Sequence, residues 1–98
     1  MATYVLLTKI SPESMAALDR LKTLEEEVKQ RISTSCPKVR WISNYMVLGP
    51  YDYLDIFEAP DEVTAGKVAT IVRSFGHATT ETWGAIPWEQ FKVMIRQL

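Results

Sequence analysis

The chain has 98 residues, of which 47% are hydrophobic and 23% are charged, and eleven basic residues against twelve acidic ones leave a net charge of -1. This composition is typical of an ordinary globular protein, so residues 1–98 are expected to form a single domain. The near-neutral charge, without a cluster of Lys or Arg, argues against nucleic acid as a partner. A domain of this size buries only roughly 60 to 65% of the surface of its unfolded chain, so a second subunit would add useful burial.

The cysteine count and the N-terminus bear on the compartment. A single cysteine cannot form an internal disulfide, and the N-terminal residues lack the charged-then-apolar pattern of a signal peptide. No apolar run approaches the ~20 residues that a membrane-spanning helix needs. We therefore expect a protein of the reducing cytoplasm that does not bind membranes.

The first half of the chain predicts a strand, a long helix and a second strand. Residues 3–10 (TYVLLTKI) are rich in β-branched and aromatic side chains, which is typical of an inner strand. Ser11 can cap a helix over residues 12–34. The apolar stripe of that helix is made of Ala17, Leu21, Leu24, Val28 and Ile32. Residues 38–48 then run extended up to the Gly-Pro pair at 49 and 50.

The second half predicts a strand, a helix and a fourth strand. Residues 51–59 are extended, and the short connection before them indicates an antiparallel hairpin. Asp61 can cap a helix over residues 62–74, and Gly76 suits its C-terminal end. Residues 77–86 form the last predicted strand.

The element order βαββαβ indicates a ferredoxin-like α+β fold. The right-handed crossover rule places the first and third strands in the middle of a four-stranded antiparallel sheet, with both long helices on one face. Pro87 opens an additional C-terminal helix. Its apolar stripe consists of Trp88, Phe91, Ile95 and Leu98. This helix should dock either on the bare face of its own sheet or on a neighbour.

Alternation along the third strand separates two sets of side chains. We expect the aliphatic pair, Leu54 and Ile56, to face the helices. The opposite set would then lie on the bare face of the sheet, and it consists of Tyr51, Tyr53, Asp55 and Phe57. The other strands are expected to add to this face Tyr4 or Thr8, then Trp41, Ser43 and Tyr45, and finally Thr79, Glu81 and Trp83.

Two such faces stacked back to back would give a dimeric α/β barrel with an aromatic and acidic interior. We expect a small molecule to bind there. The residues predicted to contact it are Thr8, Trp41, Tyr53, Asp55, Glu81 and Trp83.

Three residues are candidates for acid–base chemistry. Asp55 and Glu81 could have their pKa values pushed apart in a half-buried pocket, although partners across a dimer could equally satisfy both carboxylates. His77 could act as a base or ligate haem, but a lone histidine at the start of a strand is more often a surface residue. The favoured prediction contains no cofactor and no metal, since zinc usually takes three or four His or Cys ligands.

Three segments carry a family resemblance: TYVLLTKISPE at the start, LGPYDYLDIFEAPD in the middle and TTETW in the fourth strand. Together they resemble the GYD domain family, small βαββαβ proteins related to the dimeric α/β barrels. Pro50 separates Gly49 from Tyr51 and Asp52, which departs from the tripeptide that names the family. The resemblance implies the fold and the dimer but no reaction. Asp52 is expected to bond the backbone of the turn.

Two functions of different classes follow from these observations. The first is a non-catalytic dimer that binds a small aromatic or cationic metabolite in the cleft between sheet and helix, or that serves as a regulatory or interaction module. The second is a cofactor-independent isomerase or oxygenase that uses Asp55, Glu81 or His77 as proton carriers and Tyr53 as a hydrogen-bond donor. The enzymatic alternative is an analogy from the fold.

Overall fold

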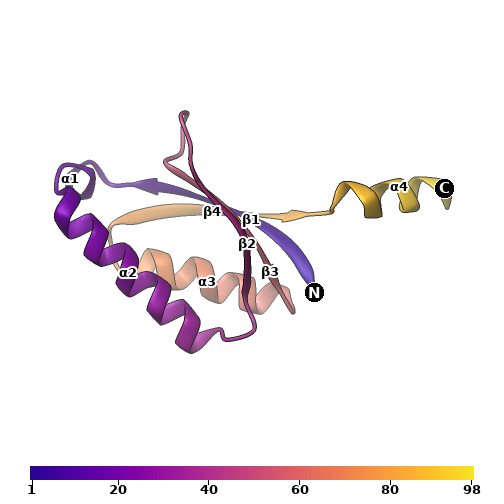
Figure 1. Ribbon diagram of the computed structural model, residues 1–98, viewed down its shortest axis with the longest axis horizontal. Coiled ribbons are helices and arrows are strands. Elements are labelled where there is room, and N and C mark those ends of the chain that lie inside the picture. Colours follow the sequence, from indigo (N-terminus) through magenta and orange to yellow (C-terminus); the bar gives the residue numbers. More distant parts are fainter.

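The computed structural model describes residues 1–98 and has one open antiparallel sheet with helices on one side (Figure 1). The elements are β1 (Ala2–Ile10), α1 (Pro12–Met15), α2 (Leu18–Ser35), β2 (Arg40–Met46), β3 (Tyr53–Ala59), α3 (Glu62–Ser74), β4 (Ala78–Ala85) and α4 (Trp88–Arg96). The strand order is β2-β3-β1-β4, so β1 and β3 are central. The predicted ferredoxin-like α+β fold is confirmed. Within one chain the sheet stays open and does not close into a barrel.

Local signals mark the start of α1 and both ends of α3. The Ser11 hydroxyl accepts a bond from the Ser14 N–H at 3.2 Å, and the Asp61 carboxylate accepts one from the Thr64 N–H at 2.8 Å. Gly76, just after α3, has the positive φ of 77° that favours glycine. The predicted continuous helix over residues 12–34 is wrong, because Ala17 is not helical and separates α1 from α2. Alanine is the best helix former, so this break is imposed by the surrounding fold and not by local preference.

The loop between β2 and β3 is longer than the tight hairpin that was predicted. It spans residues 47–52 and is closed by a bond from the Val47 N–H to the Asp52 carbonyl at 3.0 Å. Asp52 also joins the loop to the end of β1. Its N–H donates to the Thr8 carbonyl at 2.8 Å, and its carboxylate accepts from the Ile10 N–H at 2.7 Å. Asp52 was predicted to bond the backbone of its own turn; its carboxylate instead bonds the backbone of β1.

The main core lies between the sheet and helices α2 and α3. Phe57 of β3 is fully buried at its centre, with its ring centroid 5.6 Å from that of Tyr4 and 5.4 Å from that of Trp41. Val28 and Ile32 of α2 and the buried face of α3 complete this core. The helix-covered side of the sheet is therefore aromatic on β1, β2 and β3.

This arrangement reverses the predicted faces of β3. Phe57 pairs with Tyr4, and Asp55 pairs with Leu6, so both side chains point toward the helices. Leu54 and Ile56 consequently lie on the uncovered side. The prediction was wrong because the flat aromatic rings, rather than the aliphatic pair, fill the space beneath the helices.

The faces of the other strands follow from the register. Thr8 pairs with Tyr53 and lies on the helix side with Tyr4, contrary to the prediction.

An irregularity between Trp41 and Ser43 shifts the phase of β2. Trp41 therefore faces the helices, whereas Ser43 and Tyr45, which pair with Ile56 and Leu54, face outward. Glu81 and Trp83 of β4 lie on the uncovered side, as predicted, because they pair with Leu7 and Val5.

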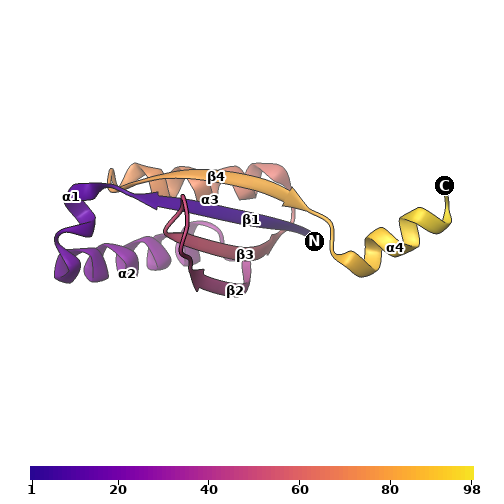
Figure 2. The ribbon, with the colours of Figure 1, turned by 90° about the horizontal axis from the view of Figure 1, so that it is seen from above.

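Helix α4 extends away from the rest of the chain (Figure 2). It has no buried residue, and it covers neither its own sheet nor any other element. Trp88 and Phe91 touch each other at a centroid distance of 5.2 Å, while Trp88, Ile95 and Leu98 are 66%, 50% and 97% exposed. No helix is long and apolar enough to cross a membrane.

Candidate functional site

The uncovered side of the sheet is largely apolar. Its central rows contain Val5, Leu7, Leu54 and Ile56 on the two inner strands, flanked by Tyr45 and Trp83 on the outer ones. We call these six residues the open sheet face. Two polar clusters interrupt it: the ion pair of Arg40 with Glu58 at 3.8 Å, and a group around Glu81. Glu81 accepts hydrogen bonds from the Tyr51 hydroxyl and, at 3.2 Å, from the indole N–H of Trp83. Leu7 is buried, and Tyr51 must reach across β1 above it to contact β4.

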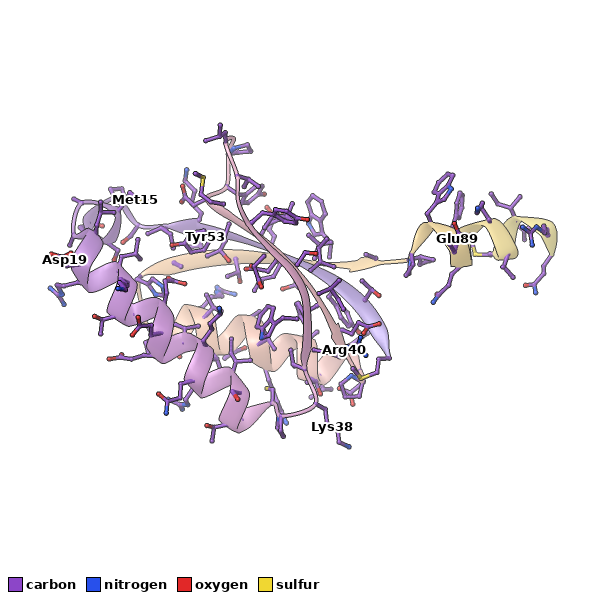
Figure 3. All side chains as sticks on the ribbon, in the orientation of Figure 1. Met15, Asp19, Lys38, Arg40, Tyr53 and Glu89 are labelled. Atoms are coloured by element: carbon purple, nitrogen blue, oxygen red, sulfur yellow. The ribbon has the colours of Figure 1, made fainter.

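A cleft of about 320 Å³ lies on the opposite side, between α2 and the sheet. We call it the α2 cleft. Its polar and charged residues are Thr8, Lys22, Glu25, Glu26, Lys29, Asn44, Tyr53 and Asp55, and its apolar wall includes Leu6, Val28, Ile32 and Trp41. Figure 3 labels Tyr53, one of the residues that line this cleft. The volume suits a small metabolite, because ligand sites in proteins start at about 300 Å³.

Asp55 is the most constrained carboxylate of the cleft. One of its oxygens accepts a hydrogen bond from the Asn44 amide at 2.7 Å. Burial raises the pKa of Asp55 above its ordinary value, the Asn44 bond opposes this rise, and the negative charge of Glu25 adds to it. The positive charge of Lys29 acts in the lowering direction. The fold thus holds a charged group at a position where water is partly removed.

Tyr53 shares this environment. Burial first, and then the negative charges of Glu25, Asp52 and Asp55, raise the pKa of Tyr53 to about 12. Its hydroxyl therefore stays protonated at neutral pH and can both donate and accept a hydrogen bond. The cleft presents one neutral hydroxyl beside one carboxylate.

Replacing Asp55 with asparagine should stabilise the fold at neutral pH. The raised pKa means that the folded state binds a proton more tightly than the unfolded state does, so stability falls as pH rises through the window above the ordinary value of 3.8. Asparagine keeps an acceptor for Asn44 without the charge. We expect Asp55→Asn to raise the Tm at pH 7, and the gain to shrink as the pH approaches 3.8, in calorimetry across this range.

Asp61 provides a control of opposite sign. Its bonds to the side chain and backbone of Thr64 lower its pKa, so its contribution is present above the ordinary value and is lost as the pH falls. Asp61→Asn should therefore lower the Tm at pH 7 or leave it unchanged. A drop in Tm for Asp55→Asn at pH 7 would contradict the burial of an under-solvated charge at Asp55.

His77 lies at the edge of this region and is not a surface residue. It is 3% exposed, and its Nε2 atom contacts the Glu25 carboxylate at 2.8 Å. The predicted surface position is therefore wrong. The reason is that Phe75 packs edge-on against the ring while α2 covers it. Nδ1 has no hydrogen-bond partner. With Nε2 engaged by Glu25, His77 links α2 to the start of β4.

The structure separates the predicted site into two groups. Thr8, Trp41, Tyr53 and Asp55 gather in the α2 cleft, whereas Glu81 and Trp83 lie on the open sheet face. Asp55 and Glu81 therefore cannot act as one acid–base pair within a chain. The roles of these residues in ligand binding stay predictions.

Five polar or charged residues of the cleft were not predicted to line it, namely Lys22, Glu25, Glu26, Lys29 and Asn44. Glu25 was not counted with the apolar stripe of its helix, yet it follows Leu21 by four residues and precedes Val28 by three, which places it on the buried stripe. Asn44 was missed because the irregularity in β2 reverses the alternation after Trp41. The helical spacing contained the signal for Glu25, but no residue pattern marked the irregularity.

The fold and the cleft define a small ferredoxin-like α+β protein with one uncovered sheet face. Over residues 4–95 the chain matches the family model of the GYD domain, so it belongs to the GYD domain family. This confirms the resemblance carried by its sequence motifs.

Two known proteins are similar to it. One, from Thermus thermophilus, is named "Glutamine synthetase and cystathionine beta-lyase binding protein". It is 30% identical over 91 residues, which cover 89% of this chain and 90% of that protein. The other is the crystal structure of FFRP-DM1, with a TM-score of 0.56 and 23% identity over 88% of this chain and 100% of that one. The second similarity supports the fold alone.

Proposed function

We propose that the protein is a regulatory interaction module that associates with itself and binds a metabolic enzyme. The observation that carries this proposal is the presence of two uncovered apolar surfaces, the open sheet face and the stripe of α4, in one small chain. On the open sheet face Tyr45 and Trp83 are exposed, Val5, Leu54 and Ile56 are partly exposed, and only Leu7 is buried. Apolar surface left accessible in this way marks protein–protein contact sites.

The open sheet face is the proposed site of homodimer formation. A symmetric dimer can stack this face on its own copy, with the aliphatic rows packing together. Four strands of about seven residues cover about 450 Å² in projection, by the usual strand spacing and rise. A stable interface buries about 800 Å² per partner. The sheets alone would therefore supply little more than half of the required area.

Helix α4 is proposed to supply the remainder by packing on the second copy. A nine-residue helix is marginal in water without tertiary contacts, and α4 buries none of its residues in its own chain. Its aromatic pair, Trp88 and Phe91, is the kind of anchor that dominates interface energies. In Figure 3 the helix, marked by Glu89, stands clear of the body and is free to reach another subunit.

The proposed enzyme partner is suggested by the relative from Thermus thermophilus, whose name states that it binds glutamine synthetase and cystathionine beta-lyase. The proposed setting is the cytoplasm, in keeping with the single free cysteine, Cys36. A small molecule in the α2 cleft would supply the regulatory signal, since β3 carries cleft residues on one side and residues of the open sheet face on the other.

The test is direct binding to glutamine synthetase and cystathionine beta-lyase from the same organism. Each enzyme is immobilised, and the full-length protein is passed over it at increasing concentration. Saturable binding to at least one enzyme, with a Kd in the micromolar range or below, is the expected result. A folded, self-associated protein that binds neither enzyme would contradict the enzyme-binding function.

A further inference from the structure

We infer that the α2 cleft binds a small organic cation in which a primary ammonium group is attached to an apolar body. The inference rests on the proposed function only in placing a ligand in this cleft, and it requires neither a dimer nor an enzyme partner. The chemical class of the ligand follows from two features of the cleft. One is its set of oxygen atoms, and the other is the group of apolar side chains beside them.

The carboxylate of Asp55 has unused capacity to accept hydrogen bonds. An ionised carboxylate offers about four acceptor sites, but the only donor to Asp55 is the Asn44 amide. Lys22 and Lys29 lie on the rim of the cleft, and neither forms an ion pair with Asp55. A positively charged donor that enters the cleft would therefore meet an unpaired, half-buried negative charge.

Two residues with hydroxyl groups, Thr8 and Tyr53, line the cleft together with Asp55. Thr8 and Tyr53 are direct partners across β1 and β3, and Asp55 is two residues beyond Tyr53 on the same side of the sheet. Such neighbours place their Cβ atoms about 5 to 8 Å apart. Thr8 is 3% exposed, and neither hydroxyl has a hydrogen-bond partner within the chain. Three oxygens that can each accept a bond match the three donors of a primary ammonium group, which has no acceptor.

The rest of the cleft suits an uncharged organic body. Trp41, Val28 and Ile32 form an apolar wall next to the polar floor. A hydrated inorganic cation would leave this wall without contacts, whereas an alkyl or aryl amine fills it and removes apolar surface from water. The nearby charge of Glu25, which is bonded to His77, adds to the negative potential of the site.

The cleft stays open in the proposed dimer. It lies on the helix-covered side of the sheet, opposite the open sheet face. Ligand binding and self-association can therefore be measured independently, and the failure of one proposal leaves the other intact.

The test compares 2-phenylethylamine with 2-phenylethanol, which have the same number of heavy atoms and differ in the charged group. Each is titrated at pH 7 into the full-length protein labelled with ¹⁵N, and the amide chemical shifts are followed. The amine should give saturable shifts at Thr8, Tyr53 and Asp55, with an affinity about tenfold or more above that of the alcohol, as expected for hydrogen bonds to a charged group.

Asp55→Asn and Glu81→Gln form a matched pair of variants. The first should weaken amine binding about tenfold or more without changing alcohol binding, and the second, on the opposite side of the sheet, should leave both unchanged. Equal affinity for amine and alcohol, an unaffected Asp55→Asn variant, or the absence of saturable amine shifts would each overturn the inference. Retained amide spectra of both variants exclude misfolding as the cause of a loss.

Discussion

Replacing Ile56 with lysine is expected to abolish the proposed self-association and leave a monomer. Ile56 pairs with Val5 on one side and Ser43 on the other, so it lies in the middle of the open sheet face. Two-fold symmetry would place two lysines in the same interface, and each uncompensated buried charge costs several kcal/mol. We expect self-association to weaken by about 100-fold or more, measured by sedimentation velocity over a dilution series.

The control places the same residue on an exposed helix surface. Gln30 of α2 is exposed, so Gln30→Lys should leave self-association unchanged. If Ile56→Lys sediments as the wild-type dimer does, the open sheet face is not the interface. If the wild-type protein is itself monomeric at every concentration, the homodimer is wrong and another protein must cover this face.

The strands show which features of the fold the sequence patterns could predict and which they could not. Period-two alternation correctly separated Leu54 and Ile56 from Asp55 and Phe57, and the crossover rule correctly placed β1 and β3 in the middle. Alternation alone cannot decide which of these two sets faces the helices, because both sets contain large apolar residues. That choice depends on how Phe57 packs with residues on other strands, and such contacts are not local in sequence.

For the same reason, only part of the candidate site could be predicted from the sequence. Thr8, Trp41, Tyr53 and Asp55 were named from the sequence and do come together, although on the side opposite to the one predicted. Thr8, Tyr53 and Asp55 could be recognised in the sequence because they are isolated polar residues within apolar strands. The contribution of α2 was hidden because Glu25 lies among other charged residues, and only the spacing to its buried neighbours distinguishes it.

The half-buried charge of Asp55 also indicates a functional role for this residue. A residue that weakens the fold at neutral pH, as its raised pKa indicates, offers no gain in stability that would account for its presence. A ligand that supplies positive charge would remove this penalty. Residues of this kind, costly for stability and suited to a ligand, are common at functional sites.

Replacing Phe57 with alanine is expected to cause the largest loss of folding stability in the chain. The ring is fully buried between Tyr4 and Trp41, and removal of a buried phenylalanine costs about 3–5 kcal/mol. This is a large part of the roughly 5–15 kcal/mol that typically stabilises a domain. Urea unfolding should be measured in the Ile56→Lys background, because the stability of a monomer does not depend on protein concentration.

A position on the opposite side of the same strand supplies the matched comparison. Leu54 is only partly buried within one chain, so Leu54→Ala in the same monomeric background should cost about 1 kcal/mol, well below the cost of Phe57→Ala. In the wild-type background the order reverses for assembly, since Leu54→Ala should weaken the dimer and Phe57→Ala should not act on it directly. Equal losses of monomer stability would mean that both sides of β3 are covered within one chain, and the open sheet face would then not exist.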